Sequence, residues 1–359
     1  MTLRQPPDPT TIRVRFPLSV SLVIPGRNCS RTITACLSAV TPLLARGELA
    51  EIIFVDDGST DDTARKVAEF PEVKLISGQG GGAGAARNLG WRAATSDLVW
   101  FIDSDTVAEP DALMRLLPHL EQEQVVAAGG SYGNMCPDSL VASLIHEEII
   151  QRHRRMPHDV NFLSTYNVIY RRDALETVGG FDETRYNGPG IAGAEDTELA
   201  YRLTACGFRL RFEPRSLVRH FHLTRLAPYF RVQQRHGFYR VRLYLDYPGR
   251  TSGDSYSNSL DHIQPILAML ILAAAALTLW QPLGSISLAL CVMLLACQIP
   301  MTIQIIARTH QWRFLAYVPF GFLRAFRRGF GLIAGVMDAV WGSLERAYAT
   351  RMIQPRKTH

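Results

Sequence analysis

Two aspartates separated by one residue follow a continuously apolar run in the first third of the chain. Asp103-Ser104-Asp105 comes directly after residues 98–102, which have the composition of a strand buried on both faces. Ligands of open α/β sheets bind beyond the carboxyl ends of the strands. Two carboxylates there can converge on Mg²⁺ or Mn²⁺ and on the ribose or diphosphate that accompanies the ion. Elsewhere the tripeptide is a common surface turn, but its place after this strand favours a metal and nucleotide site.

A second acidic pair, Asp56-Asp57, ends another predicted strand, residues 51–56. At the same edge of the sheet, Asp57 can accept a hydrogen bond from a nucleobase N–H. The pair is followed by Gly58-Ser59-Thr60, which is turn and N-cap chemistry for a helix. Because two acids are available, capping and ligand contact are compatible, and Asp57 is predicted to contact the ligand.

Two further candidates lie in the second half of the chain. Glu195-Asp196 follows the glycine-rich residues 187–193 and begins a predicted helix. The helix dipole would keep a carboxylate ionised there, so that it could act as a general base from a mobile loop, although capping is the alternative use. His220 and His222 follow the last predicted strand. A histidine there could complete the ligand shell of a metal ion. More commonly, histidines in such a place lie at the surface or at an interface.

The elements that must position these side chains alternate in the rhythm of a parallel α/β sheet. Amphipathic segments separate short apolar runs from residue 20 onward. The predicted strands cover residues 20–25, 51–56, 73–76, 97–103, 125–132, 167–171 and 208–213. One predicted helix follows the first strand, and a second has Asp61 and Asp62 in its first turn. A third runs through Arg87 to Trp91. A fourth spans 197–206, with Gly207 at the C′ position.

A glycine-rich run, residues 78–83, fits the dinucleotide-binding pattern G-x-G-x-x-A and raises the alternative of an oxidoreductase. That pattern should open the first βαβ unit, whereas this run follows the third predicted strand. It would also leave the acids at 103, 105, 195 and 196 without a role. The glycines are instead predicted to let the chain pass close to a nucleotide, with Arg87 available for phosphate.

The last third of the chain is predicted to lie in a membrane. Residues 263–280 and 283–307 contain no charged side chain and are long enough to cross a bilayer, with Pro300 as a predicted kink. The short linker 281–282 indicates a hairpin. Arginines flank its outer ends, which predicts a cytoplasmic catalytic domain on an inner, multi-pass membrane protein. Residues 314–341 are predicted to be an interfacial segment or a third span. A buried soluble hairpin is the alternative.

The composition supports an ordered chain at a membrane surface. The 359 residues are 47% apolar and 20% charged, with a net charge of +5. Arginines gather on both sides of the apolar stretch, which favours anionic lipid over nucleic acid as a partner. The six cysteines form no CxxC pair and are expected to be reduced. Because the first nineteen residues lack an apolar core, no export signal is expected.

Taken in order, these motifs resemble the inverting family 2 glycosyltransferases of the GT-A fold. The resemblance covers roughly residues 18–240 and rests on a set of segments: 20–25 with Asn28, 55–61, 84–88, 101–105 and 195–196. It implies a Rossmann-like, mostly parallel sheet that binds a nucleotide-diphosphate sugar, with Mg²⁺ or Mn²⁺ as cofactor. Uridine and guanosine diphosphate carriers both stay open, because base selectivity rests on backbone geometry around Pro25 and Asp57.

The resemblance also implies roles for single residues. Asp57 would lie beside the base, Asp103 near the ribose, and Asp105 on the metal that bridges the diphosphate. Asp196 would take the proton from the acceptor hydroxyl. The predicted set is therefore catalytic Asp196 and Glu195, nucleotide-binding Pro25, Asp57, Arg87 and Asp103, and metal-binding Asp105, Asp103 and His220.

One departure from the family concerns processivity. Processive polysaccharide synthases of this family are expected to carry Gln-x-x-Arg-Trp before their membrane helices, and the nearest string here, residues 233–237, has no tryptophan. This favours transfer of one sugar to a lipid-linked or membrane-proximal acceptor. A processive synthase and a non-catalytic membrane scaffold are the alternatives.

The expected organisation has three parts. It comprises a catalytic domain at 18–240, a basic membrane-surface connector at 241–262 and a membrane region at 263–345. Residues 186–193 and the connector are expected to contribute to the acceptor site.

Overall fold

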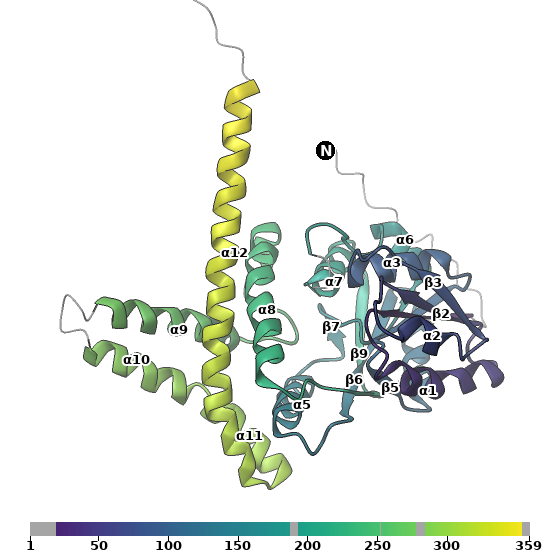
Figure 1. The fold of residues 1–359 in the computed structure, drawn as a ribbon, viewed down its shortest axis with the longest axis horizontal. Coiled ribbons are helices and arrows are strands. Elements are labelled where there is room, and N and C mark those ends of the chain that lie inside the picture. Colours follow the sequence, from purple (N-terminus) through teal and green to yellow (C-terminus); the bar gives the residue numbers. More distant parts are fainter. Residues whose placement is uncertain (1–18, 187–192, 252, 278–283, 354–359) are drawn as a thin grey trace, which may run out of the picture. The chain divides into compact units, whose positions relative to one another are not determined.

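The computed structural model of this chain describes residues 19–186, 193–251, 253–277 and 284–353. The chain divides into two compact units, both drawn in Figure 1. The first unit comprises the chain up to Thr224 together with Asp254–Ser257, and the second comprises Arg225–Gly253 and the chain from Asn258 onward.

The first unit is built on a mixed nine-stranded sheet. Its order is β3-β2-β1-β4-β8-β6-β9-β5, with β7 paired to β9. The strands are β1 Val20–Gly26, β2 Glu51–Asp56, β3 Val73–Ser77, β4 Leu98–Ile102, β5 Thr106–Ala108, β6 Val125–Asn134, β7 Asp159–Val160, β8 Asn167–Arg171 and β9 Arg209–His220. β1 to β4 are mutually parallel, whereas β8 runs antiparallel to β4 and β6. The predicted α/β fold class is confirmed.

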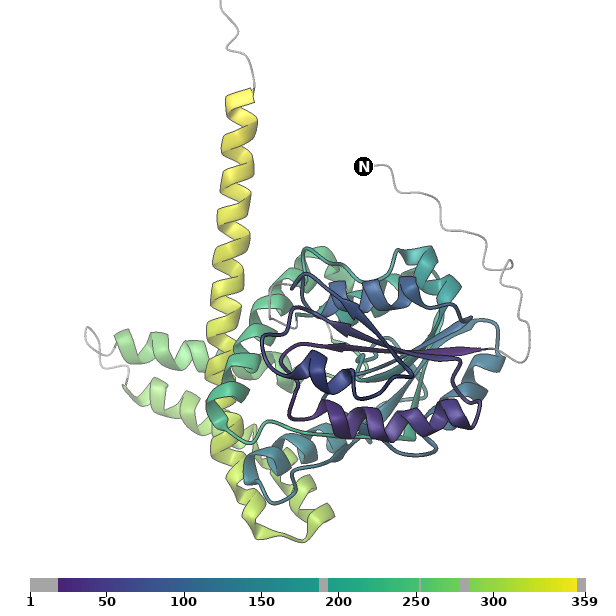
Figure 2. The same cartoon turned by 45° about the vertical axis from the view of Figure 1, so that its right-hand side comes forward.

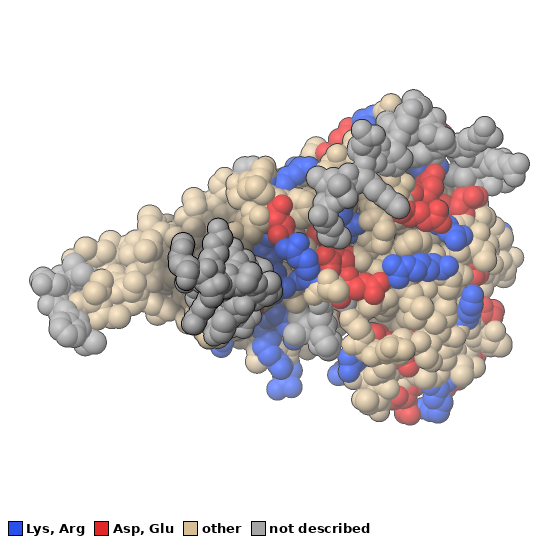
Figure 3. Space-filling model, turned by 90° about the horizontal axis from the view of Figure 1, so that it is seen from above, with Lys and Arg blue, Asp and Glu red and all other residues tan. Residues whose placement is uncertain are grey.

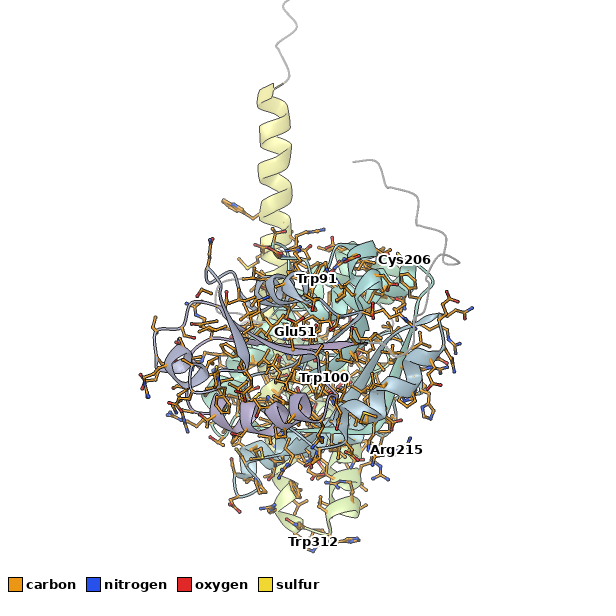
Figure 4. The ribbon with its side chains drawn as sticks, turned by 90° about the vertical axis from the view of Figure 1, so that its right-hand side faces the viewer. Glu51, Trp91, Trp100, Cys206, Arg215 and Trp312 are labelled. Atoms are coloured by element: carbon orange, nitrogen blue, oxygen red, sulfur yellow. The ribbon has the colours of Figure 1, made fainter. Side chains whose placement is uncertain are left out.

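Helices cover both faces of the sheet because successive strand side chains point to opposite sides. Leu22 and Ile24 of β1 join one core, and Val23 between them joins the other. The first core is closed by α1 Ile33–Ala45 and α4 Ala112–Leu116, and the second by α3 Ala83–Ala93, α6 Arg172–Val178 and α7 Glu195–Ala205. Figure 2 shows α1 in purple along one side of the sheet, and Figure 4 shows Trp100 among the packed side chains.

Helix α3 approaches the sheet closely at Gly90. A Cβ atom built on this residue would lie 2.3 Å from Cγ1 of Val23 in β1, so a larger residue would push the helix away. This close packing fixes α3, and with it Arg87, relative to the central strands.

Several predicted boundaries differ from the observed ones. Strand β9 continues to His220, beyond the predicted end at 213, and the short strand β5 was not predicted. Helix α2 Thr63–Val67 begins after Asp61 and Asp62, so the expectation that both acids lie in its first turn is wrong. Asp61 instead accepts a hydrogen bond from the Thr63 amide at 3.0 Å, which orders the turn before the helix.

The second unit consists of helices. They are α8 Leu226–Asp246, α9 Ser259–Leu277, α10 Gly284–Ala296, α11 Ile299–Thr309 and α12 Tyr317–Ile353. α8 and α12 lie side by side (Figure 1), and glycines permit their close contact. A Cβ atom on Gly237 of α8 would lie 2.1 Å from the carbonyl oxygen of Arg328. One on Gly331 of α12 would lie 1.9 Å from that of Gln234. Arg328 also donates to the Gln233 side chain at 2.7 Å.

Two stretches of this unit are long and apolar enough to cross a membrane: Ser259–Leu277 and Ser285–Thr309. A core helix of a soluble protein can meet the same criterion, so they are weak evidence for membrane association. The second stretch is interrupted between α10 and α11, directly before the predicted kink at Pro300. The predicted linker at 281–282 lies outside the described residues. Residues 314–341 form the end of a 3₁₀ turn, Trp312–Ala316, and most of α12.

Candidate functional site

The turn between β4 and β5 holds Asp103 and Asp105. Thr106 closes it by donating to the carbonyl oxygen of Asp103 from both its amide, at 3.1 Å, and its hydroxyl, at 2.7 Å. β5 then pairs antiparallel with β9, with Thr106 opposite His220. This pairing brings Nε2 of His220 to 3.3 Å from Oδ2 of Asp105, so two of the three residues predicted to bind a metal are neighbours.

The charges of Asp105 and His220 support each other. Burial opposes ionisation of both groups, but their mutual attraction outweighs it: the pKa of Asp105 lies below its ordinary value and that of His220 lies above. Within the described ranges, no group of three or more His, Cys, Asp or Glu side chains is arranged to hold a metal ion by itself. A cation here would therefore need further ligands, and Mg²⁺ commonly takes these from substrate phosphates and water.

Asp103 belongs to a buried ion network centred on Arg87 of α3. The guanidinium donates to Oδ1 of Asp103 at 2.9 Å and to Oε1 of Glu195 at 2.8 Å. Burial raises the pKa of both carboxyls, and the arginine opposes this rise. The structure thus places Arg87 between two acids, and its contact with a donor phosphate stays a prediction.

The neighbouring acids Glu195 and Asp196 are held differently. Glu195 is buried and accepts hydrogen bonds from Arg87 and from the Gly193 amide at 3.0 Å. Asp196 is half-buried: its Oδ2 accepts from the Ser164 hydroxyl at 2.9 Å and its Oδ1 from the Thr197 amide at 2.7 Å. Ser164 was missed from the sequence because it stands in an irregular loop before β8 and belongs to no motif. Most of the predicted acceptor loop, 187–192, lies outside the described residues.

The two residues of the second acidic pair, Asp56 and Asp57, make different contacts. Oδ1 of Asp56 accepts from the Ser59 amide at 2.9 Å and orders the turn after β2. Asp57 is 5% exposed, and its Oδ2 accepts from the Gly82 amide at 2.8 Å. Gly82, at φ 93°, belongs to the glycine-rich loop that leads into α3. Pro25 lies in β1 opposite Val55, so it reaches the same edge of the sheet as Asp57.

Behind Asp105 lies a cluster of three histidines, of which His220 and His222 were candidates from the sequence and His146 was not. His222 is buried, unlike the surface position expected for such a residue, and burial lowers its pKa to about 2. Its Nδ1 lies 3.0 Å from Nδ1 of His220, and its Nε2 lies 3.4 Å from Nδ1 of His146. His146 comes from α5 Leu140–His153, a helix without a recognisable motif. The cluster depends on contacts between segments far apart in sequence.

The sequence matches known glycosyltransferases. Residues 21–179 match the model of "Glycosyl transferase family 2". A pre-mycofactocin glycosyltransferase of Mycobacterium tuberculosis is 30% identical over 250 residues, which are 65% of this chain and 49% of the relative. An N-acetylglucosaminyltransferase of Mesorhizobium japonicum is 25% identical over 317 residues, which are 83% of this chain and 74% of the relative. The chain thus spans about half the length of the first of these relatives, 49%.

The fold has a counterpart among solved structures. A mannosyltransferase from Pyrobaculum calidifontis, in complex with GDP-Man and Mn²⁺, aligns with a TM-score of 0.54 at 20% identity. The alignment covers 94% of this chain and 89% of the other. At this identity the likeness shows a shared fold.

Proposed function

We propose that this protein, whose residues 21–179 match the model of glycosyl transferase family 2, moves one sugar from a nucleotide-diphosphate donor to a hydroxyl of a lipid-linked or membrane-proximal acceptor, with inversion. The observation that carries the proposal is the grouping of acids at one edge of the sheet. Asp105 faces His220, and Asp103 is joined through Arg87 to Glu195, whose neighbour Asp196 is half-buried.

The donor half of the proposal rests on six residues, four of them for the nucleotide and two more for the cation. Pro25 and Asp57 would line the base, Asp103 would accept from the ribose, and Arg87 would contact phosphate. The pair Asp105 and His220 offers one oxygen and one nitrogen ligand, and Asp103 offers a second carboxylate, which fits a Mn²⁺ or Mg²⁺ that completes its shell with the diphosphate. When bound, the cation would offset negative charge on the leaving diphosphate. The structure of the mannosyltransferase of similar fold contains a nucleotide-sugar together with a cation, GDP-Man and Mn²⁺.

The acceptor half rests on Asp196. A general base must lie within hydrogen-bond reach of the proton that it removes and must be ionised. Ser164 donates to Asp196 Oδ2 and would orient the carboxylate without neutralising it. The acceptor oxygen would form its bond to the anomeric carbon as the bond to the diphosphate breaks, and its proton would pass to Asp196. A single displacement of this kind inverts the anomeric centre. Glu195, bound by Arg87, would position the start of α7.

Transfer of one sugar, rather than processive synthesis, is supported by the packing of α8. In the string 233–237, Gly237 stands where the processive motif has tryptophan. Its Cα faces the backbone of Arg328, and even a methyl group there would lie 2.1 Å from a carbonyl oxygen. Gln233 is engaged by Arg328. Residues 233–237 therefore pack against α12, and position 237 has no room for an indole ring.

Membrane attachment is supported by the exposure of the apolar helices. Only 33% of the apolar window in Ser259–Leu277 and 17% of that in Ser285–Thr309 is buried, which a soluble core hairpin would not tolerate. Their exposed side chains include Ile266, Leu288 and Ile303. In Figure 3 the face of the α9–α10 pair that is visible is mostly tan. We infer that this hairpin lies in lipid, with the catalytic domain on the cytoplasmic side of an inner membrane.

The test is release of nucleotide from a panel of nucleotide-sugars by the full chain in detergent, with Mn²⁺ or Mg²⁺. We expect cation-dependent hydrolysis of one donor, lost in Asp105→Ala and retained in Asp111→Ala, an exposed aspartate of the same type. Failure of the folded protein to bind any nucleotide would favour the non-catalytic scaffold. Once the donor and acceptor are known, mass spectrometry of the product should show one added sugar, and a ladder of products would favour a processive synthase.

A further inference from the structure

The histidines behind Asp105 form a continuous path of facing polar atoms. From Oδ2 of Asp105 the path runs to Nε2 of His220 at 3.3 Å and from Nδ1 of His220 to Nδ1 of His222 at 3.0 Å. It continues from Nε2 of His222 to Nδ1 of His146 at 3.4 Å. Three segments contribute: the turn after β4, the end of β9 with the residues that follow, and α5. We propose that His222 is a positioning residue that holds His220 in the tautomer able to bind a cation beside Asp105.

The argument follows from which ring nitrogens can carry hydrogen. Where two imidazole Nδ1 atoms face each other at 3.0 Å, one must donate and the other accept. A His220 that offers its Nε2 lone pair to a cation keeps its hydrogen on Nδ1, so His222 must then accept. The hydrogen of His222 is in that case on Nε2, which faces Nδ1 of His146. Histidines that bind metals usually donate their second N–H in this way, and the partner fixes the ring.

The burial of His222 supports this role over simple packing. Its side chain is enclosed, with a relative exposure of 4%, and an aliphatic residue would fill such a site without needing polar partners. Both of its ring nitrogens instead face imidazole nitrogens. His153, at 7% exposure, lies outside this path, since its nitrogens face the hydroxyls of Ser131 and Tyr166.

The inference rests on the proposed cation site, so its test measures Mn²⁺ binding and does not depend on turnover. Free Mn²⁺ is followed by electron paramagnetic resonance during titration of the full chain in detergent. His222→Leu removes the acceptor, whereas His222→Asn places an amide oxygen near the position of Nδ1. We expect the dissociation constant to rise about 10- to 100-fold in His222→Leu and to stay within about threefold of the parent value in His222→Asn. His146→Leu, which removes the end of the path, should give a smaller rise.

The matched control is His153→Leu, which removes a buried histidine outside the path and should leave Mn²⁺ affinity within about threefold. Equal affinity of a folded His222→Leu variant and the parent would overturn the inference, as would equal losses in the Leu and Asn variants. If His222→Leu does not fold, the other two variants decide. Parental Mn²⁺ affinity in His222→Asn, together with a raised dissociation constant in His146→Leu, supports the path. Any other pattern contradicts it. A parent chain that binds no Mn²⁺, even with nucleotide present, would overturn the cation site as well, which separates the two failures.

Discussion

Arg87 donates a hydrogen bond of 2.8 Å to Glu195, a residue 108 positions later in the chain. The contact joins the helix that follows the glycine-rich loop to the N-terminus of the helix that carries Asp196. Both side chains are buried, with 6% and 5% of their surface exposed. A buried charge without its partner is costly, so the position of each helix depends on the other.

Arg87→Met should destabilise the first unit strongly, because it leaves the carboxylates of Asp103 and Glu195 without their cation. Removing one partner of a buried pair typically costs about 3–5 kcal/mol of unfolding free energy. Arg92→Met, on the same helix, breaks an exposed pair with Glu183 and should cost less than about 1 kcal/mol. Denaturant unfolding in detergent measures both. Similar losses in the two variants would show that the buried network contributes little.

Asp196→Asn should slow sugar transfer while leaving the donor bound. Loss of a general base commonly lowers kcat about 10²- to 10⁴-fold, and the amide can still accept from Ser164. Donor affinity, measured by calorimetry, should stay within about threefold of the parent because Asp196 is predicted to contact the acceptor. Asp182→Asn, an acid in the loop after α6, is the control and should keep parental kcat. A normal kcat in Asp196→Asn would remove this residue from the role of base.

Acid should destabilise the protein partly through His153. Burial lowers the pKa of this imidazole from 6.5 to about 3, so the unfolded chain binds a proton more readily between these values. The unfolding free energy should therefore fall as the pH drops below 6.5, by up to about 1.4 kcal/mol per pH unit, until about pH 3.

The measurement compares thermal unfolding from pH 7 to pH 4 for the parent and His153→Phe. The variant should show a shallower pH dependence, although loss of the Ser131 contact lowers its stability by a constant amount at every pH. His158→Phe, at an exposed position, should keep the slope of the parent. Parallel curves for the parent and His153→Phe would contradict the assignment.

Gly237→Ala should disrupt the packing of α8 on α12. The added methyl group would lie 2.1 Å from the carbonyl oxygen of Arg328, which is rigid helix backbone, so the helices must separate. Overpacking of this kind typically costs about 1–3 kcal/mol. Gly249→Ala is the matched control, because a Cβ atom there meets no atom of the described residues within 4 Å. Proteolysis at the α8–α12 pair should increase in the first variant only, and equal resistance would refute the close contact.

The strands that lead into the site were predictable because their sequences are locally consistent. β2 Glu51–Asp56 and β8 Asn167–Arg171 match the predicted residues, since β-branched and apolar runs end there at turn-forming or charged residues. The parallel order of β2, β1 and β4 explains why Asp57 and Asp103 lie at the same edge of the sheet. Local patterns of this kind also indicated α7, ended by Gly207 at φ 83°.

Contacts between segments that are far apart in the chain could not be predicted from the sequence. Nothing in the spacing of Arg87 indicates that its guanidinium is shared between Asp103 and Glu195. Ser164 stands in an irregular loop, and His146 lies on a helix whose buried face carries several charged residues, so neither has a periodic signal. The short strand β5 has three residues, too few for alternation to be recognised, yet it decides which histidine faces Asp105.

The turn that carries Asp103 and Asp105 is held by paired strands at both of its ends. It leaves β4, which is held by β1 and β8, and enters β5, which is held by β9. Most surface connections accept insertions because only one loop must rearrange. An extra residue here would shift β5 along β9 and move Asp105 out of register with His220. Other loops around the sheet can therefore accept an added residue, whereas an insertion into this three-residue connection should separate Asp105 from His220.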